Sequence, residues 1–350
     1  AAFAGVCEAN LSLYVKTSNT DFFDAAQSAC EKGLLIDGES AEVHVSLGAL
    51  YRHHGEYSRA ESEQRSALAV EPGNIDALIE LGLALSLQGK IRESESWLQQ
   101  AAAQQPNHWP AHNALFNFYR SYDDRPGRSE RAVRHAMRVV ELTPDAASAW
   151  NNLGTAYHGM QQYEAAKTAW NKALELAPTR TGYTNRGLQY YYEGRYEDAV
   201  EMQLKAVQLA PDDHRVWGRL AESYRFLDER QKESKEAYSQ AIRLAGVRLN
   251  VNPKDWRTRG LLATYYVNSG RSDVAKEAIQ LALDHSHRDP EILLYAALVA
   301  HGMGDTESTL LALEEMVERD ETFRQYAVED PDLSSLIGND RFDRLLEPLP

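Results

Sequence analysis

The stretch ASAWNNLGTAYHGMQQYEAAKTAWNKALELAP, residues 147–178, decides the fold of this chain. Its apolar residues follow the 3.6-residue period of a helix in two successive runs. The first run places Trp150 and Tyr157 on one face, and the second places Ala166 and Trp170 on one face. The turn GMQQ separates the runs, and a proline that cannot continue a helix closes the second. The stretch therefore predicts a helical hairpin.

Closing prolines recur along the chain at a nearly constant interval. They stand at positions 72, 106, 144, 178, 211 and 253, with intervals of 34, 38, 34, 33 and 42 residues. One hairpin cannot bury its own apolar faces, so a repeated hairpin predicts a stack of neighbours. The excess of the fourth repeat lies in the turn SYDDRPGR, residues 121–128, and that of the seventh repeat predicts a longer second helix before Pro253.

The pattern W-x2-L-G-x2-Y, followed by A-x3-aromatic and a closing proline, resembles the tetratricopeptide repeat. The resemblance implies an all-α protein: an α-solenoid of about nine tetratricopeptide-repeat (TPR) hairpins in a right-handed superhelix. We expect a divergent hairpin over residues 1–38, the repeat array over 39–320, and C-terminal capping helices over 321–350.

Composition and motifs restrict the class of function. The net charge is −15 and no basic stripe is visible, so nucleic acid is not expected as a partner. The longest apolar run, residues 292–300, is too short to cross a bilayer, so we expect no direct membrane insertion. No nucleotide-binding or hydrolase motif occurs, and His285 and His287 are interpreted as solvated turn residues. We therefore expect no enzyme, cofactor or metal.

Cys7 and Cys30 lie at equal distances from the turn predicted near Thr17 to Thr20. In an antiparallel hairpin they would stand at the same height. We interpret them first as two small apolar residues in a core, and second as a possible disulfide, which would require an oxidising compartment. A cytoplasmic location is favoured, with a periplasmic one if the parent protein carries a membrane anchor upstream.

The two ends of the chain carry a narrower resemblance. ANLSLYVKTSNTDFFDAAQSACEKGLLID (residues 9–37) and DPDLSSLIGNDRFDRLL (330–346) resemble the TPR region that follows the kinase domain in bacterial eukaryotic-like serine/threonine kinases. The resemblance implies a larger bacterial signalling protein, with a kinase or other signalling domain as a partner in the same chain. The chain begins without Met, and we expect it to be a piece of such a protein.

In such a solenoid the first helix of each hairpin lines the concave surface. Asparagine side chains can donate and accept hydrogen bonds to a peptide backbone, and arginine can pair with a carboxylate. The polar and aromatic residues predicted to bind a peptide there are Asn113, Asn117, Asn151, Asn152, Asn185, Tyr191, Tyr192, Arg215 and Arg219.

This order is similar to the carboxylate clamp of chaperone-binding relatives but lacks its leading lysine. The alternative interpretation is that these side chains are solvated, or that Asn152 and Asn185 bridge adjacent hairpins. We predict a non-catalytic scaffold that binds a peptide or helix of a partner protein. The alternatives are an oligomerisation element of the parent protein and a small-molecule sensor.

Overall fold

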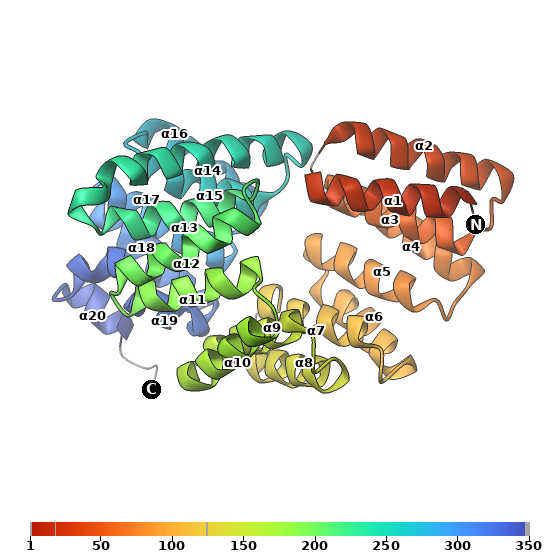
Figure 1. The fold of residues 1–350 in the computed structure, drawn as a ribbon, viewed down its shortest axis with the longest axis horizontal. Helices are drawn as coiled ribbons and strands as arrows, with labels where there is room; N and C mark the ends of the chain where they lie inside the picture. Colours follow the sequence, from red (N-terminus) through yellow and green to blue (C-terminus); the bar gives the residue numbers. More distant parts are fainter. Residues whose placement is uncertain (1, 18, 124, 347–350) are drawn as a thin grey trace. The chain divides into compact units, whose positions relative to one another are not determined.

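The computed structural model describes residues 2–17, 19–123 and 125–346 (Figure 1). Helices, and no strands, make up the regular structure of this part of the chain. The α-helices are α1 (Ala2–Thr17), α2 (Thr20–Ile36), α3 (Ala41–His54), α4 (Tyr57–Val70), α5 (Ile75–Leu87), α6 (Ile91–Gln104), α7 (Trp109–Ser121), α8 (Arg128–Leu142), α9 (Ala147–Gly159), α10 (Tyr163–Leu176), α11 (Arg180–Tyr192), α12 (Tyr196–Leu209), α13 (His214–Arg225), α14 (Gln231–Val251), α15 (Trp256–Asn268), α16 (Ser272–His285), α17 (Pro290–Gly302), α18 (Thr306–Arg319), α19 (Arg324–Glu329) and α20 (Asp340–Leu346). Three short 3-10 helices are η1 (Asp228–Arg230), η2 (Glu321–Phe323) and η3 (Pro331–Leu336).

Consecutive helices from α1 to α8 and from α11 to α18 pair as hairpins, which confirms the predicted all-α class. The chain divides into two compact units, unit 1 (Ala1–Ala169) and unit 2 (Trp170–Pro350), and each is described by itself. The predicted terminal segments 1–38 and 321–350 also include residues 1, 18 and 347–350, which lie outside the described residues.

Glycine at the repeat position allows the two helices of a hairpin to approach closely. A Cβ on Gly48 would lie 2.3 Å from Nε2 of Gln64, a buried residue of the second helix. The amide nitrogen donates a hydrogen bond to the Val45 carbonyl at 3.0 Å, within the same hairpin. The arrangement recurs in unit 2, where a Cβ on Gly187 would lie 2.5 Å from Nε2 of Gln203.

Two of the repeat tryptophans also join one hairpin to the next. Trp150 Nε1 donates a hydrogen bond to the Pro144 carbonyl at 2.7 Å, and Trp217 Nε1 donates one to the Pro211 carbonyl at 2.8 Å. Both tryptophans occupy the first position of the repeat pattern W-x2-L. In addition, each one satisfies a carbonyl next to the end of the preceding helix, where intrahelical donors are missing.

The long turn of the fourth repeat is organised by a buried carboxylate. Asp123 accepts hydrogen bonds from Arg125 at 2.6 Å and from Arg131 at 2.7 Å. Arg125 also donates to Glu95 of α6 at 2.8 Å. Burial alone would raise the pKa of Asp123, but the hydrogen bonds from the two arginines outweigh it and hold the pKa below its usual value. The described residues of the turn are therefore tied to α6 and α8.

The additional residues of the seventh repeat lengthen its second helix. Helix α14 has 21 residues, whereas α12 and α16 have 14 each. At 3.6 residues per turn the difference is about two turns. Its last turn is fixed because Arg248 donates a hydrogen bond to Asp255 at 2.8 Å.

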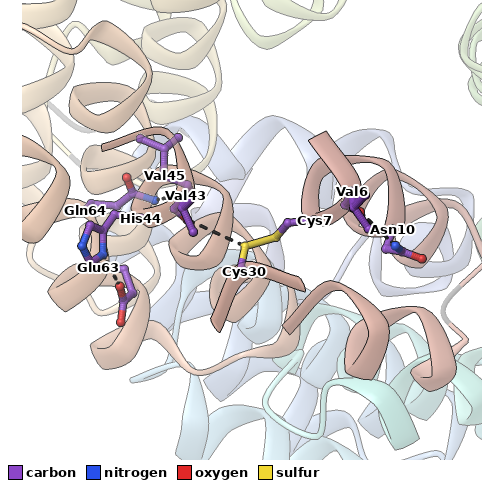
Figure 2. Close-up of a disulfide and its surroundings, with 9 residues drawn as sticks. All are labelled: Val6, Cys7, Asn10, Cys30, Val43, His44, Val45, Glu63 and Gln64. Carbon is purple, nitrogen blue, oxygen red and sulfur yellow. Dashed lines mark hydrogen bonds and ion pairs between the residues drawn. A yellow bond between two sulfur atoms is a disulfide. The ribbon is translucent and has the colours of Figure 1, made fainter. Parts of the chain in front are cut away.

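The first hairpin is closed by a disulfide between Cys7 and Cys30 (Figure 2). The antiparallel pairing of α1 and α2 places the two Cα atoms 5.4 Å apart, within the range that a disulfide spans. Both cysteines are buried, and Figure 2 shows Val43 of α3 beside Cys30. The structure thus corrects the favoured interpretation of two separate packed thiols.

After α18 the chain continues through η2, α19, η3 and α20 and folds back onto unit 2. The side chains of Ala327, Leu333, Leu336 and Phe342 are buried in one hydrophobic cluster with residues of α15 to α18. Arg341 of α20 adds an ion pair to Glu314 of α18 at 2.7 Å. These residues cover an apolar surface at the end of the array that would otherwise be exposed to water.

Candidate functional site

The predicted site falls in both units, and its unit 1 part is a group of amides on consecutive first helices. Asn152 of α9 donates a hydrogen bond through Nδ2 to Oδ1 of Asn113 on α7, at 2.8 Å. Asn117, one turn further along α7, donates to the Asn113 backbone carbonyl at 3.0 Å. All three side chains are partly exposed. We call Asn113, Asn117 and Asn152 the amide group; the Asn113–Asn152 bond also matches the alternative prediction of a bridge between hairpins.

Asn151 does not share this surface. Its exposed fraction is 1%, and Thr155 donates to its backbone carbonyl at 3.0 Å. Adjacent positions on a helix point about 100° apart, so Asn151 faces the interior while Asn152 faces outward. The prediction that Asn151 contacts a ligand is therefore corrected by its burial.

In unit 2 the two predicted arginines already have carboxylate partners. Arg215 donates to both oxygens of Asp213, at 2.9 and 2.7 Å, and Arg219 donates to Glu222 at 2.9 Å. Burial would raise the pKa of Asp213, but hydrogen bonds from Arg215 outweigh it and lower the pKa to about 2. Both arginines therefore reach a ligand only as part of an ion pair, which differs from an open carboxylate clamp.

The remaining predicted residues lie on α11. Tyr191 has an exposed fraction of 5%, and its ring contacts that of Phe226, with 5.5 Å between centroids. Tyr192 is partly exposed, and burial of its hydroxyl raises its pKa. Asn185 is partly exposed and lies two turns before Tyr192 on the same side of the helix. Tyr191 thus supports the surface, while Tyr192 and Asn185 form part of it.

Sequence reasoning missed the charged residues that surround these tyrosines. Arg225 lies in the last turn of α13 and forms an ion pair with Asp332 of η3, a residue 107 positions later in the chain. Glu222 lies between Arg219 and Arg225 on α13. We call Tyr192, Arg219, Glu222 and Arg225, together with the buried Tyr191 that supports them, the α11–α13 face.

The C-terminal segment brings two carboxylates to the α11–α13 face. Besides Asp332, Asp330 lies close enough to Tyr192 and Arg219 to interact with both electrostatically. Burial, followed by repulsion from Asp332 and Glu222, raises the pKa of Asp330 to about 7. The face is thus already occupied by acidic side chains of the same chain.

Within the described residues, neither unit offers an arrangement suited to holding a metal ion. Among the described residues, no group of three or more His, Cys, Asp or Glu side chains is placed to coordinate one. His285 and His287, the predicted turn residues, belong to no such group there. In the same part of the chain, no helix has the length and apolar content to cross a membrane. The chemistry that these surfaces offer is hydrogen bonding by amides and tyrosines and ion pairing by arginines.

Models of one family match three segments of the chain, at residues 55–115, 147–180 and 181–213. These segments are tetratricopeptide repeats. The repeat at 147–180 includes α9 with Asn152, and the repeat at 181–213 includes most of α11 with Tyr191 and Tyr192. Repeats of this type stack into extended surfaces, and side chains of their first helices form much of both candidate surfaces.

Several proteins are similar in sequence to this chain. The BBSome complex member BBS4 of Bos taurus is 24% identical over 297 residues, covering 85% of this chain and 48% of that protein. The human protein O-mannosyl-transferase TMTC1 is 24% identical over 182 residues, covering 42% of this chain and 20% of that protein. The peroxisomal targeting signal receptor of Yarrowia lipolytica is 24% identical and covers 46% of this chain and 28% of that protein. The chain spans less than half of the length of these relatives.

Two solved structures share the fold over nearly the whole chain. The Cut9–Hcn1 hetero-tetramer of the APC/C matches with a TM-score of 0.54 at 18% identity, over 95% of this chain and 60% of that chain. The human IFIT1 dimer with PPP-AAAA matches with a TM-score of 0.54 at 13% identity, over 99% of this chain and 87% of that chain. At these identities the likeness shows the α-solenoid fold alone.

Proposed function

We propose that this chain is a non-catalytic protein-interaction scaffold that binds an extended peptide or a helix of a partner protein through its first-helix surfaces. The observation that carries the proposal is the amide group of unit 1, where partly exposed asparagines on consecutive first helices lie within hydrogen-bond distance. The similarity of the chain to a BBSome complex member and to a targeting signal receptor supports the same class of function.

The amide group has the chemistry to hold a peptide backbone. The bond between Asn152 and Asn113 uses one N–H of the first residue and one lone pair of the second. By the valence of an amide, the Asn113 NH2 group and the Asn152 carbonyl keep hydrogen-bonding capacity. A donor and an acceptor held side by side match the carbonyl and N–H of one extended peptide unit. Partner side chains would then select the sequence.

We further propose that the scaffold is the regulatory or docking region of a larger bacterial signalling protein. The support is the resemblance of residues 9–37 and 330–346 to the TPR regions that follow kinase domains. The Cys7–Cys30 disulfide favours an oxidising compartment such as the periplasm over the cytoplasm, because cytosolic thiols are kept reduced.

Affinity capture from bacterial lysate would test the amide group. We would compare the wild-type chain with the double variant Asn117→Ala, Asn152→Ala, and with Gln100→Ala on the exposed side of α6 as a matched control. Circular dichroism melts would establish that all three are equally folded. We expect a protein held by the wild type and the control and lost by the double variant. Equal capture by all three would contradict the proposed surface.

A second candidate function is self-association through the first hairpin. Leu35 and Ile36 at the end of α2 are 86% and 74% exposed, and Val6 of α1 is 50% exposed. Apolar side chains gathered at one terminal hairpin favour a contact with another chain or domain. Analytical ultracentrifugation of the wild type and of Leu35→Glu would decide it, since a monomer at all concentrations for both would exclude this function.

A further inference from the structure

Residues 329–336 form a contact that repeat periodicity does not explain. They follow the last hairpin, yet Asp332 reaches Arg225 of α13, which belongs to a hairpin two repeats earlier. The carboxyl and guanidinium groups are 19% and 27% exposed, so the ion pair is largely removed from water. Close by, Ser335 lies within hydrogen-bond distance of His301 on α17, at 3.2 Å.

Residues 329–336 are held by both apolar and charged contacts. Leu333 and Leu336 are buried in the hydrophobic cluster that includes residues of α15 to α18. Asp330 and Asp332, which precede them, contribute charge to the α11–α13 face. Asp330 Oδ1 also accepts a hydrogen bond from the Asp332 backbone N–H at 3.0 Å, which fixes the turn at the start of η3. The buried leucines and the two aspartates thus hold the same short turn in place.

The charges of this contact are not balanced. The face supplies two cations, Arg219 and Arg225, and one anion, Glu222. The segment adds two carboxylates, of which Asp332 forms the direct ion pair with Arg225. Asp330 has no such pair among the described ion pairs and is repelled by Asp332 and Glu222, which together with its burial raises its pKa to about 7. The resident segment therefore places one carboxylate in an ion pair with Arg225 and the other in a buried site near two further carboxylates.

We propose that the α11–α13 face is a receptor site for an aspartate-bearing acidic segment of a partner protein, and that residues 329–336 occupy this site in cis. The inference rests on the proposed scaffold function and assigns the partner chemistry of unit 2. A partner must displace the resident segment before it binds. The contact thus lowers the apparent affinity for the partner by the fraction of molecules in which the face is open.

The chemistry of the face supports an acidic occupant. Guanidinium groups form charge-assisted hydrogen bonds with carboxylates, and the tyrosine hydroxyls nearby are further donors. The resident segment itself shows that an Asp-Pro-Asp turn fits the available space. The imbalance at Asp330 makes the fit imperfect, and a partner that carries a single carboxylate opposite Arg225 would avoid the repulsion.

Two isosteric variants of the full chain test the proposal, because they should have opposite effects on how firmly residues 329–336 are held. Asp332→Asn removes the ion pair with Arg225, while Asp330→Asn removes the repulsion and keeps the oxygen that caps η3. Hydrogen exchange measured by mass spectrometry would follow residues 324–338. We expect exchange there to rise by about 10-fold or more in Asp332→Asn, because the charge-assisted hydrogen bond to Arg225 is lost. We expect it to stay equal or fall in Asp330→Asn.

Binding of a fluorescein-labelled peptide AVEDPDLSSLIG, residues 327–338 of this chain, would test the receptor role. We expect Asp332→Asn to bind it with an apparent Kd about 10-fold lower than that of the wild type. Arg225→Gln should release the cis segment in the exchange experiment but fail to bind the peptide. The peptide with Asn in place of its second aspartate is the matched control ligand and should bind weakly to all of these proteins.

Three results would overturn the proposal: unchanged exchange in Asp332→Asn, a released segment without peptide binding, or equal peptide binding by Asp332→Asn and Arg225→Gln. These readouts involve only unit 2 and a peptide of the chain itself. A failure here would leave the capture experiment on the unit 1 amide group unaffected, so the two proposals fail separately.

Discussion

Reduction of the Cys7–Cys30 disulfide should loosen the first hairpin and leave the other repeats of unit 1 intact. The bond closes a loop with a sequence separation of 23 residues. The chain-entropy relation for a loop of that length gives about 3.4 kcal/mol at 25 °C, or roughly a 300-fold change in an opening equilibrium. Repeats contact mainly their neighbours, so the loss should be confined to α1, α2 and the start of α3.

Hydrogen exchange with and without a phosphine reductant is the measurement. We expect amides of α1 and α2 to exchange up to about 300-fold faster after reduction, and those of α5 to α8 to be unchanged. A Cys7→Ala, Cys30→Ala double variant is the control, because the reductant should no longer affect it. Unchanged exchange in α1 after complete reduction would refute the entropic reasoning, and faster exchange throughout unit 1 would refute the nearest-neighbour reasoning.

Three further changes should alter stability in directions that the structure sets. Asp123→Asn should lower the free energy of unfolding of unit 1 by about 2 kcal/mol in urea titrations, because it leaves two partly exposed arginines without their buried carboxylate. His214 is 4% exposed, and its burial lowers its pKa to about 4. The unfolded chain binds this proton at a pKa of about 6.5, so the free energy of unfolding of unit 2 should fall by about 3 kcal/mol as the pH drops from 6.5 to 4. The variant His214→Gln should remove this pH dependence from thermal melts. Gly48→Ala should lower the free energy of unfolding by about 1–3 kcal/mol, because its Cβ would displace the buried Gln64 amide. Thermal melts would show this as a lower melting temperature.

The sequence predicted the repeat architecture well because the signal is local and repeated. Trp150 and Pro178 belong to a motif whose spacing fixes two helices and a turn, and closing prolines at similar intervals imply the stack. The longer second helix before Pro253 followed from the same count, since the additional residues had to enter a helix or a loop. For such features the spacing of residues along the chain is enough to predict where helices and turns lie.

The candidate site was less predictable because it depends on helix phase and on distant contacts. Asn151 and Asn152 differ by one position in sequence, yet one is buried and the other lies at the surface. Asp332 and Arg225 are 107 residues apart and belong to no common motif, so periodicity gave no sign of their ion pair. The equal height of Cys7 and Cys30 was visible in the sequence, whereas their bonded state was not decided by it.

The indoles that bind proline carbonyls also give the molecule two internal fluorescent reporters. Trp150 reports on a junction within unit 1 and Trp217 on a junction within unit 2, because each ring is tied to the end of the hairpin before it. Opening of a junction transfers that indole from a fixed hydrogen bond to water, which shifts its emission to longer wavelength. A chain that retains one of these tryptophans and has phenylalanine at the other tryptophan positions would thus reveal, without any added label, which unit loosens first.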